Sequence, residues 1–491
     1  MLKAVKSLVS ASFVYGLGTI ASKFIGFFLL HIFTRYLRPE QYGLFETFNV
    51  LFFLLNTVGT LGMDTAMIRF YYDSKDQAYR KLVVSSSLFL ALGAGLFLAL
   101  LGLACSSSLN GLLFKGVDQI NTLHVTMFLV VASTVNTVQL ALFQTKRQPG
   151  RYSILTFIRF VSMYGLSVYF LIQGDGVFGL MISQLIAYCL SLVIGFIFAR
   201  NDFRFSASAS ISKEMLVFSA PLIVGSVSIW LLSSSDRFFL LRLSTLNELG
   251  LYSLGSRLAS IVLFAVTAFQ MAWPQFALSR AEDHNVAYTN ARILTYYLFV
   301  GILLVLGITL FTPEILRVLA TDQYARAGSV VFLLSCSFLF YGCFFIFGII
   351  LSLTKKTLSI LPVTIPPFVV SVLLNYYLVP RMGGMGSAIA STCAYSLMAT
   401  LSFIFTNRLL PIRYEWGRIL KMVMLAGLLL IAGRLMPPLP LLISLVLKAL
   451  LLLMYFAGLV LLKFFLPIEI ETIKALFQHP FDSPDRAVNP K

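Results

Sequence analysis

The residues of this sequence that could do chemistry are charged side chains inside long apolar runs. Lys23, Arg159 and Arg257 are cations in such runs. An ammonium or guanidinium group in a low-dielectric setting binds phosphate and carboxylate oxygens through charge-assisted hydrogen bonds. A charge at the centre of a bilayer costs about 2.5–3.5 kcal/mol on insertion scales, so a charge retained there is a candidate functional residue. We therefore predict that these three cations line a binding site for an anionic substrate.

Lys23 and Arg159 also have structural explanations. Lys23 could extend its long side chain to the membrane surface, or it could pair with a carboxylate on another helix. Arg159 lies about two helical turns from Arg151 and could reach the same surface. Lys448, near the end of the chain, fits packing or a lipid-facing edge better than substrate binding.

Four further charged residues are candidates for ion coupling or gating: Glu46, Asp64, Asp236 and Arg237. Glu46 could instead cap its helix, because the helix dipole favours an acid in the first turn. Asp64 could pair with Arg69 or cap the next turn. Adjacent residues on a helix point about 100° apart, so we expect Asp236 to meet a base from another helix rather than Arg237.

The composition places all of these residues in a membrane protein. Hydrophobic residues make up 58% of the 491, charged residues 12%, and the mean hydropathy is +0.89. That is more apolar surface than a soluble domain can bury. The alternating ten-residue pattern of a membrane β-barrel is missing. The net charge of +17 is spread between apolar runs rather than gathered on one patch, which argues against nucleic acid as a partner.

Apolar windows predict about fourteen transmembrane helices in an all-α fold. The expected segments are 8–34, 44–68, 82–105, 120–144, 152–172, 177–199, 214–237, 247–275, 293–312, 327–352, 358–379, 385–406, 418–435 and 441–465. With both termini in the cytoplasm, 24 of the 37 Lys and Arg residues lie on that side, nine lie outside and four lie within helices. The positive-inside rule favours this orientation.

Prolines fall inside three of these segments and are plausible helix breaks or hinges. They are Pro221, Pro274, Pro362, Pro366 and Pro367. The five cysteines lie in or beside apolar runs without a CxxC pair, so we expect no metal site and no cofactor.

The sequence contains an internal duplication. A shift of 207 residues aligns Arg35 with Arg242 and Gly43 with Gly250, and nine of 25 positions are identical between 174–198 and 381–405. Two parallel six-helix repeats follow, related by an axis along the membrane normal. The predicted parts are an N-terminal lobe (1–205), a C-terminal lobe (206–412), two extra helices (413–466) and a cytoplasmic tail (467–491).

Several local patterns carry a family resemblance. They are Phe218-Ser-Ala-Pro-Leu-Ile223, Asp236-Arg-Phe-Phe, Leu249-Gly-Leu-Tyr, Asn375-Tyr-Tyr-Leu-Val-Pro380 and Gly383-Gly-Met-Gly-Ser-Ala-Ile-Ala-Ser391. With fourteen helices and the duplication, the chain resembles the polysaccharide-biosynthesis transporters of the multidrug/oligosaccharidyl-lipid/polysaccharide (MOP) superfamily. Within that superfamily it is most similar to Wzx-type flippases of undecaprenyl-diphosphate-linked oligosaccharides.

The resemblance implies a multi-pass protein of the bacterial plasma membrane that flips a lipid-linked glycan by alternating access. Its lobes would enclose a central cavity, with Lys23 and Arg257 beside the substrate diphosphate. Membrane lipid, H⁺ or Na⁺, a polysaccharide polymerase and export proteins are the implied partners. The sequence contains no GxxxxGK[ST] loop for ATP, in agreement with an ion-driven transporter.

Two other functions remain open. A multidrug exporter of the same superfamily would favour acidic pockets for its cationic substrates, whereas the mid-membrane charges here are mostly basic. A membrane-embedded polysaccharide polymerase or ligase would need an exposed catalytic constellation, and the predicted outer loops are short and poor in acids. We therefore expect a transporter rather than an enzyme.

Overall fold

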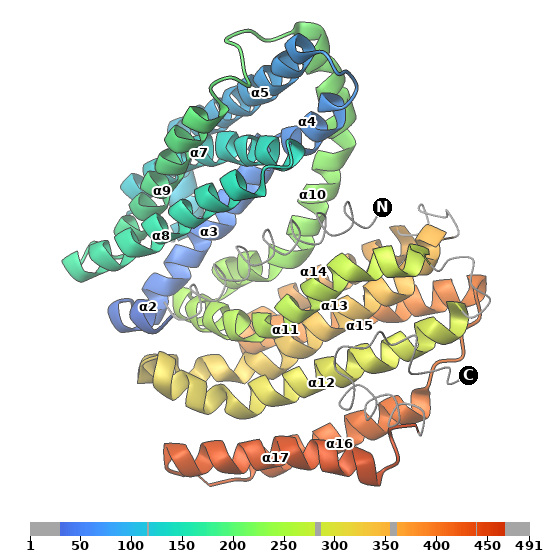
Figure 1. Ribbon diagram of the computed structural model, residues 1–491. Helices are drawn as coiled ribbons and strands as arrows, with labels where there is room; N and C mark the ends of the chain where they lie inside the picture. The colour runs from blue at the N-terminus through green and yellow to red at the C-terminus, as the bar shows by residue number, and fades with distance from the viewer. Residues whose placement is uncertain (1–29, 115–116, 280–285, 354–360, 438, 467–491) are drawn as a thin grey trace. The chain divides into compact units, whose positions relative to one another are not determined.

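The computed structural model describes residues 30–114, 117–279, 286–353, 361–437 and 439–466. Every regular element in these ranges is a helix (Figure 1). The structure therefore confirms the all-α fold class. Lys23 lies outside the described residues, as do most of the first predicted segment and the predicted tail.

Twelve helices of the described part are long and apolar enough to cross a membrane. Each matches one predicted segment: Pro39–Tyr71, Gln77–Ala104, Ile120–Thr145, Pro149–Gln173, Gly176–Ala199, Leu246–Gln270, Tyr288–Leu319, Asp322–Gly348, Pro362–Met382, Gly384–Leu409, Trp416–Arg434 and Leu441–Leu461. The predicted segment 214–237 lies within another long helix, Ala209–Leu243.

The helices follow one another with short connections, in the following order. They are α2 (Leu30–Tyr36), α3 (Pro39–Gly59), α4 (Met63–Tyr71), α5 (Gln77–Ala104), α6 (Ser106–Phe114), α7 (Ile120–Thr145), α8 (Pro149–Gln173), α9 (Gly176–Ala199), α10 (Ala209–Leu243), α11 (Leu246–Ser279), α12 (Val286–Leu319), the 3₁₀ helix η1 (Asp322–Val330), α13 (Val331–Leu353), α14 (Leu361–Met382), α15 (Gly384–Leu409), α16 (Trp416–Arg434) and α17 (Leu441–Leu461).

The helices form two compact units. The first comprises the described part of Met1–Leu254, with Arg317–Ala327 and Ser371–Ser387. The second comprises Gly255–Leu316, Gly328–Val370 and the described part of Ala388–Lys491.

In the first unit, α7 is the central helix and contacts α3, α5, α8 and α9 (Figure 1). Its buried side chains include several polar ones, among them Ser133, Thr134 and Asn136. Small residues allow neighbouring helices to approach it closely: a Cβ on Gly95 of α5 would lie 2.6 Å from the Thr134 hydroxyl oxygen. Such small-residue contacts are typical of helices that pack in a membrane.

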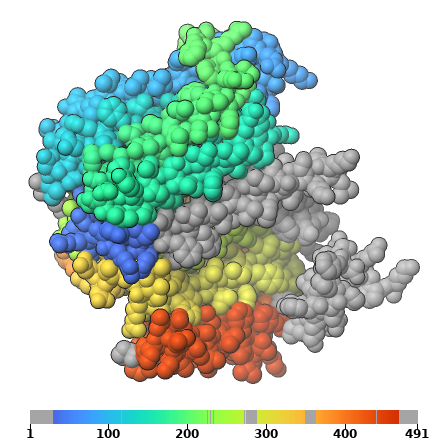
Figure 2. Space-filling view, turned by 60° about the vertical axis from the view of Figure 1, so that its left-hand side comes forward, coloured from blue at the N-terminus to red at the C-terminus, as the bar shows by residue number. Residues whose placement is uncertain are grey.

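The second unit contains the two helices that lie outside the duplication. α16 and α17 pack against each other, and Tyr455 of α17 stacks on Phe299 of α12 with ring centroids 6.5 Å apart. The other face of α17 exposes large apolar side chains such as Leu442, Leu453 and Leu461. The surface of this helix appears in red in Figure 2. An apolar exposed face is what a lipid-facing helix requires.

The breaks in the helices differ from those that the prolines predict. α10 continues through Pro221, and α11 continues through Pro274. Three further prolines lie within the first two turns of α14. The second predicted segment does break, between α3 and α4, where Leu61 and Gly62 have φ of 53° and 64°. Proline is tolerated inside a membrane helix where neighbouring groups satisfy the freed carbonyl. The helix is interrupted instead at Leu61 and Gly62, whose left-handed backbone conformation does not continue an α-helix.

Candidate functional site

Arg159, on α8, belongs to a polar cluster formed by α7, α8 and α9. Its Nη1 donates to Oδ1 of Asn136 at 2.9 Å, and its guanidinium carbon lies 4.9 Å from the ring centroid of Tyr188. Nδ2 of Asn136 donates to Oγ of Ser191 at 2.9 Å and to Oε1 of Gln139 at 3.3 Å. We call these five residues the Arg159 cluster. The bonds to Ser191 and Gln139 hold the Asn136 amide so that its oxygen faces Arg159.

The Arg159 cluster lies near the middle of its helices. Arg159 is ten residues from the first residue of α8, which is about 15 Å along the helix axis. Asn136 is nine residues from the last residue of α7, or about 14 Å. The two ends lie together, because α7 and α8 are joined there by a short turn. Arg159 and its partner are therefore at the same depth, close to half of a 30 Å hydrocarbon core.

This geometry argues against the alternative in which Arg159 reaches the membrane surface beside Arg151. Arg151 bonds elsewhere, to Oε1 of Gln148 and the carbonyl of Phe198. The guanidinium of Arg159 extends sideways because a fixed amide oxygen and an aromatic face lie within its reach. Among the residues that the structure describes, no carboxylate forms an ion pair with it.

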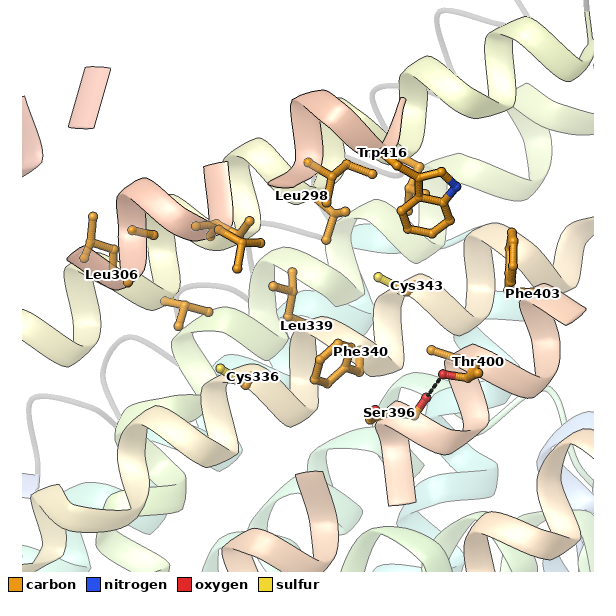
Figure 3. Close-up of a pocket in the computed structure, with 18 of the residues that line it drawn as sticks. Leu298, Leu306, Cys336, Leu339, Phe340, Cys343, Ser396, Thr400, Phe403 and Trp416 are labelled. Atoms are coloured by element: carbon orange, nitrogen blue, oxygen red, sulfur yellow. Dashed lines mark hydrogen bonds between the residues drawn. The ribbon is translucent and has the colours of Figure 1, made fainter. Parts of the chain in front are cut away.

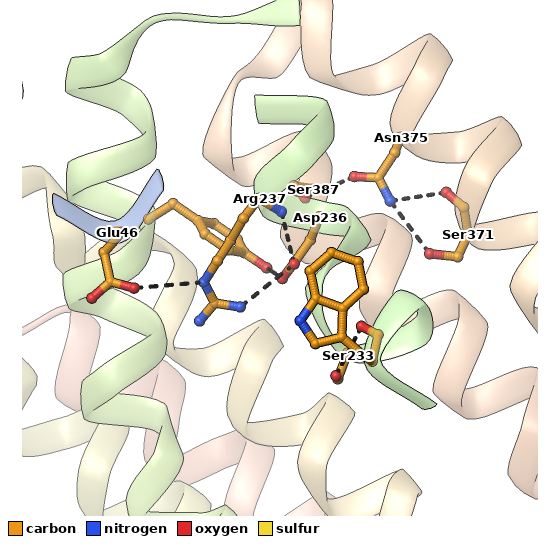
Figure 4. A network of polar contacts seen from close by, with 9 residues as sticks. Glu46, Ser233, Asp236, Arg237, Ser371, Asn375 and Ser387 are labelled. Carbon is orange, nitrogen blue, oxygen red and sulfur yellow. Dashed lines mark hydrogen bonds and ion pairs between the residues drawn. The ribbon is translucent and has the colours of Figure 1, made fainter. Parts of the chain in front are cut away.

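A second polar network joins α3, α10 and α11 in the first unit (Figure 4). Oδ2 of Asp236 accepts a hydrogen bond from the Tyr252 hydroxyl at 2.5 Å, and its Oδ1 accepts one from the backbone N–H of Arg237 at 2.7 Å. Nε of Arg237 lies 4.0 Å from Oε2 of Glu46, and its Nη1 lies 3.5 Å from Oδ1 of Asp236. The network thus links three helices through two acids, one base and one phenol.

Two expectations about this network were wrong. Asp236 does pair with its neighbour Arg237, because the long arginine side chain folds back despite the divergent Cα–Cβ directions. Among the described residues, its partner from another helix is the phenol of Tyr252 rather than a base. Glu46 does not cap its helix: α3 begins at Pro39, so Glu46 lies about two turns in and is buried.

Asn375 forms a separate group that the same figure shows (Figure 4). Its Nδ2 donates to the carbonyl of Ser371 at 2.9 Å, and its Oδ1 accepts from the hydroxyl of Ser387 at 2.7 Å. The amide is fully buried. Both of its ends are satisfied within the protein, which fits a structural role between α14 and α15.

Close to the first turn of α3, two glycines at equivalent positions of the duplication meet. A Cβ on Gly43 would lie 2.9 Å from the backbone nitrogen of Gly250, and a Cβ on Gly250 would lie 3.0 Å from that of Gly43. One turn away, Nδ2 of Asn247 donates to Oε1 of Glu40 at 2.7 Å, and these two residues are also 207 apart. Both contacts therefore join residues that the duplication aligns with each other.

Asp64 lies in the first turn of α4, directly after the left-handed pair that breaks the second segment. The expected ion pair with Arg69 does not form, because Arg69 pairs with Asp73 one turn further on. Asp64 is not the N-cap either, since Gly62 occupies that position. Among the described residues no base forms an ion pair with Asp64, and the helix N-terminus favours its negative charge.

Arg257 lies eleven residues into α11, about three turns from its start and partly exposed. It belongs to the second unit and the Arg159 cluster to the first. Lys23, the third predicted cation, is outside the described residues. The described part of the chain contains no group of three or more His, Cys, Asp or Glu side chains that could hold a metal ion.

Lys448 is a packing residue rather than a lipid-facing one. Its Nζ lies 2.6 and 2.7 Å from the two carboxylate oxygens of Glu314 on α12, and the Ser444 hydroxyl donates to the same carboxylate at 2.5 Å. All three side chains are buried. This ion pair joins α17 to α12 within the second unit.

The second unit also contains an apolar cavity of about 500 Å³ lined by α12, α13, α15 and α16 (Figure 3). Leu298, Leu339, Phe340 and Phe403 are among its lining residues. The hydroxyl of Thr400 donates to the carbonyl of Ser396, so this polar group in the wall is already satisfied. The cavity can take a hydrocarbon chain but offers little to a sugar or a phosphate.

Two features of these sites were not predicted from the sequence. Asn136 was not singled out, although Ser133, Asn136 and Gln139 recur every three residues in an apolar run and so share one helix face. The contact between Gly43 and Gly250 was also missed. The duplication had already aligned them, and glycine is the residue that allows a close approach of two backbones.

Comparison with known families and proteins gives a consistent result. Residues 8–279 match the family described as Polysaccharide biosynthesis protein. A curated relative is Lsg locus putative protein 1 of Haemophilus influenzae, which is 23% identical over 271 residues. The match covers 53% of this chain and 63% of the relative. The chain thus spans less than two thirds of the curated relative it matches.

Solved structures share the fold over most of the chain. A lipid II flippase MurJ in an inward closed conformation superimposes with a TM-score of 0.74 at 15% identity, covering 91% of this chain and 98% of that one. An inward-facing MATE multidrug transporter of the MOP superfamily gives a TM-score of 0.63 at 18% identity, with coverages of 78% and 93%. The chain therefore shares its fold with these two transporters.

Proposed function

Because the chain belongs to the polysaccharide biosynthesis protein family, we propose that it is a flippase of undecaprenyl-diphosphate-linked oligosaccharide. It would move this substrate from the cytoplasmic to the outer leaflet by alternating access, as a step in the synthesis of a surface polysaccharide. The observation that carries the proposal concerns Arg159, a cation near the middle of the membrane. Within the part of the chain that the structure describes, no carboxylate forms an ion pair with it. A head group bearing a diphosphate requires such cations when it leaves water.

The apolar cavity of the second unit is a further point in favour of a lipid-linked substrate. Its walls suit a hydrocarbon chain, and a flippase substrate carries one. In this proposal Lys23 and Arg257 bind the diphosphate, and the protein lies in the bacterial plasma membrane with both termini in the cytoplasm. A polysaccharide polymerase and export proteins would act on the product.

Ion coupling by H⁺ or Na⁺ would supply the driving force. Asp64 is a candidate for this role, because it lies inside a membrane helix at a break in the backbone and has no basic partner among the described residues. Glu46, Asp236 and Arg237 are better suited to gating, since they join three helices that would have to separate if α3 moved away from α10 and α11.

The second candidate function is multidrug export, which the likeness to MATE transporters favours. The two functions differ in the charge that the binding site needs. Cationic drugs require acids, and the Arg159 cluster contains a base and neutral amides. A polymerase or ligase activity has no support from the family or the fold.

The test is to replace Arg257 and Lys23 by alanine, singly, in the source bacterium. We expect both variants to lower the amount of surface polysaccharide while the protein reaches the membrane at wild-type levels. Lipid-linked oligosaccharide should accumulate on the cytoplasmic side. Wild-type polysaccharide output from both variants would contradict the assignment of these cations, and unchanged polysaccharide after deletion of the gene would contradict the flippase function.

A further inference from the structure

Two equivalent niches lie in the first unit, one in each half of the duplication. Gly176, which begins α9, and Gly383, which directly precedes α15, are 207 residues apart and have φ of 51° and 54°. Gln41 of α3 and Glu248 of α11 are also 207 residues apart, and each lies beside the glycine of its own half. We call the pair of Gln41 and Gly176 the α9 niche, and the pair of Glu248 and Gly383 the α15 niche.

The α15 niche is filled by the protein itself. Oε2 of Glu248 accepts a hydrogen bond from the backbone N–H of Gly384 at 3.2 Å, and Oε1 lies 3.5 Å from Nη2 of Arg326. A Cβ on Gly383 would lie 2.6 Å from Oε2. The carboxylate therefore caps the start of α15 and occupies the space beside it.

The α9 niche is not filled in this way. A Cβ on Gly176 would lie 3.9 Å from Nε2 of Gln41, whose Oε1 accepts from the backbone N–H of Arg38 at 3.0 Å. Val177 is the counterpart of Gly384, and in the described part of the chain no group accepts a hydrogen bond from its backbone N–H. The N-cap residue Asp175 makes no side-chain capping bond either. The start of α9 thus keeps the free donors that a helix start has before it is capped.

A depression of about 550 Å³ lies over the α9 niche. This volume is in the range of small-molecule binding sites. Its lining contains no Lys or Arg. It includes acids, amides and an aromatic ring: Glu40, Asp118, Asp175, Gln41, Asn121 and Phe178.

The polar groups of this depression call for a ligand that both donates and accepts hydrogen bonds. Nε2 of Gln41 is a donor, and the Asp175 carboxylate is an acceptor; neither bonds to another described residue. The Glu40 carboxylate accepts from Asn247, which uses one of its roughly four acceptor positions. A hydroxyl group donates and accepts at once, and a sugar carries several of them.

The remaining features of the depression favour a neutral sugar over an ion. Three acids without a base in the lining repel an anion. The described residues include no group of three His, Cys, Asp or Glu side chains that could hold a metal ion. Phe178 is 37% exposed and lies three residues after Asp175, so its ring is on the same side of the helix start. An aromatic ring offers an apolar face to the C–H groups of a sugar ring.

We propose that this depression is a binding site for a neutral sugar of the transported glycan, on the outer side of the membrane. The inference rests on the proposed flippase function. The depression lies at the starts of α3, α7 and α9, away from the turn that joins α7 to α8. That turn carries Lys146 and Arg147, so the positive-inside rule places it in the cytoplasm and the depression outside. A sugar bound there has already crossed the membrane.

Gln41→Glu is the decisive variant, because it gives the α9 niche the residue type that fills the α15 niche. Its two oxygens can accept from the backbone N–H groups of Arg38 and Val177 together. We expect the affinity for the glycan to fall about tenfold, as for the loss of one or two neutral hydrogen bonds. The midpoint of thermal unfolding should not fall, since the new carboxylate caps α9. Gln323→Glu is the matched control: it adds the same acid at an exposed position of η1 outside this depression, and binding should equal that of the wild type.

Phe178→Leu tests the aromatic face without a change of charge. The affinity should fall about threefold or more, because the ring stacks on the sugar. Phe205→Leu, at a phenylalanine that is 91% exposed elsewhere on the first unit, is its control and should bind normally. This pair keeps the inference testable if Gln41→Glu does not fold.

Binding is measured by saturation-transfer NMR on purified full-length protein in phosphatidylcholine nanodiscs. The probe is the oligosaccharide that mild acid releases from the lipid-linked fraction of the source bacterium. We expect saturation transfer to its neutral sugar residues in the wild type and in Gln323→Glu, and a loss of signal in Gln41→Glu. Inorganic diphosphate should not compete.

The side of the membrane is tested with Asn121→Cys in a chain whose five cysteines are replaced by alanine. A membrane-impermeant maleimide should label this variant from outside intact spheroplasts, and the released oligosaccharide should slow the labelling. Labelling only after the spheroplasts are opened would refute an outer site.

Three binding results would overturn the inference: equal glycan affinity of the wild type and Gln41→Glu, no saturation transfer in the wild type, or displacement of the glycan by diphosphate. The binding assay does not depend on flipping. Glycan binding by a protein whose deletion leaves surface polysaccharide unchanged would retain the site and refute the flippase function. Loss of polysaccharide on deletion without glycan binding would do the reverse.

Discussion

Gly43 and Gly250, which occupy equivalent positions in the two halves of the duplicated sequence, pack backbone to backbone. A Cβ on Gly43 would clash with the carbonyl oxygen of Leu246 on α11. A Cβ on Gly250 would clash with the carbonyl oxygen of Pro39 on α3. Backbone cannot yield as a flexible side chain can. The two helices that carry these glycines, α3 and α11, therefore meet at this point without any side chain between them.

Gly43→Ala should force this contact apart. Overpacking in a tight contact costs about 1–3 kcal/mol, so the midpoint of thermal unfolding should fall. Export should also fall if the transport cycle requires this contact to close. Gly93→Ala on α5 is the control, since a Cβ there has no neighbour within 4 Å. A Gly43→Ala protein as stable and active as Gly93→Ala would show that the backbone has room to move.

Tyr252→Phe should loosen the network around Asp236. It removes one hydrogen bond to a carboxylate, worth about 1.5–3 kcal/mol. A double-mutant cycle with Asp236→Asn, read from thermal unfolding, measures the coupling directly. Tyr169→Phe, at an exposed tyrosine, should have no effect. Additive losses in the cycle would mean that the 2.5 Å hydrogen bond makes no net contribution.

Lys448→Met should destabilise the second unit strongly, because it leaves the Glu314 carboxylate buried without its base. Breaking a buried ion pair from one side costs about 3–5 kcal/mol. The double variant Glu314→Gln/Lys448→Met should recover most of that loss in a thermal-unfolding measurement. Lys463→Met, at an exposed lysine, is the control. Equal stability of the single and double variants would contradict a specific pair.

Gly62→Ala should strain the break between α3 and α4. Gly62 has φ of 64°, and a left-handed conformation costs an L-residue about 1–2 kcal/mol. The new Cβ would also lie 3.1 Å from Cβ of Ser219 on α10. We expect a lower unfolding midpoint together with altered export, since the break positions Asp64. Gly165→Ala, in open space on α8, should change neither quantity.

The helices could be predicted from the sequence because an apolar run of about 20 residues has the length that a helix needs to cross the membrane. The partners of charged side chains could not. Arg237 folds back onto Asp236, and Asp236 meets the phenol of Tyr252, because side-chain reach and helix packing decide between several nearby groups. The site of the helix break was also hidden: proline is an obvious signal, whereas the left-handed Leu61 and Gly62 have none of comparable strength.

The Glu314–Lys448 pair has a consequence for the order in which the chain is made. The two residues are 134 positions apart, so the ribosome needs roughly 7–27 s between them. During that interval the acid is in or near the bilayer with its base still unmade. We therefore expect α12 to become stable in the bilayer only when the last helix is complete. A chain truncated before residue 448 would keep an unpaired carboxylate in the membrane, where the cell's quality-control proteases could recognise it.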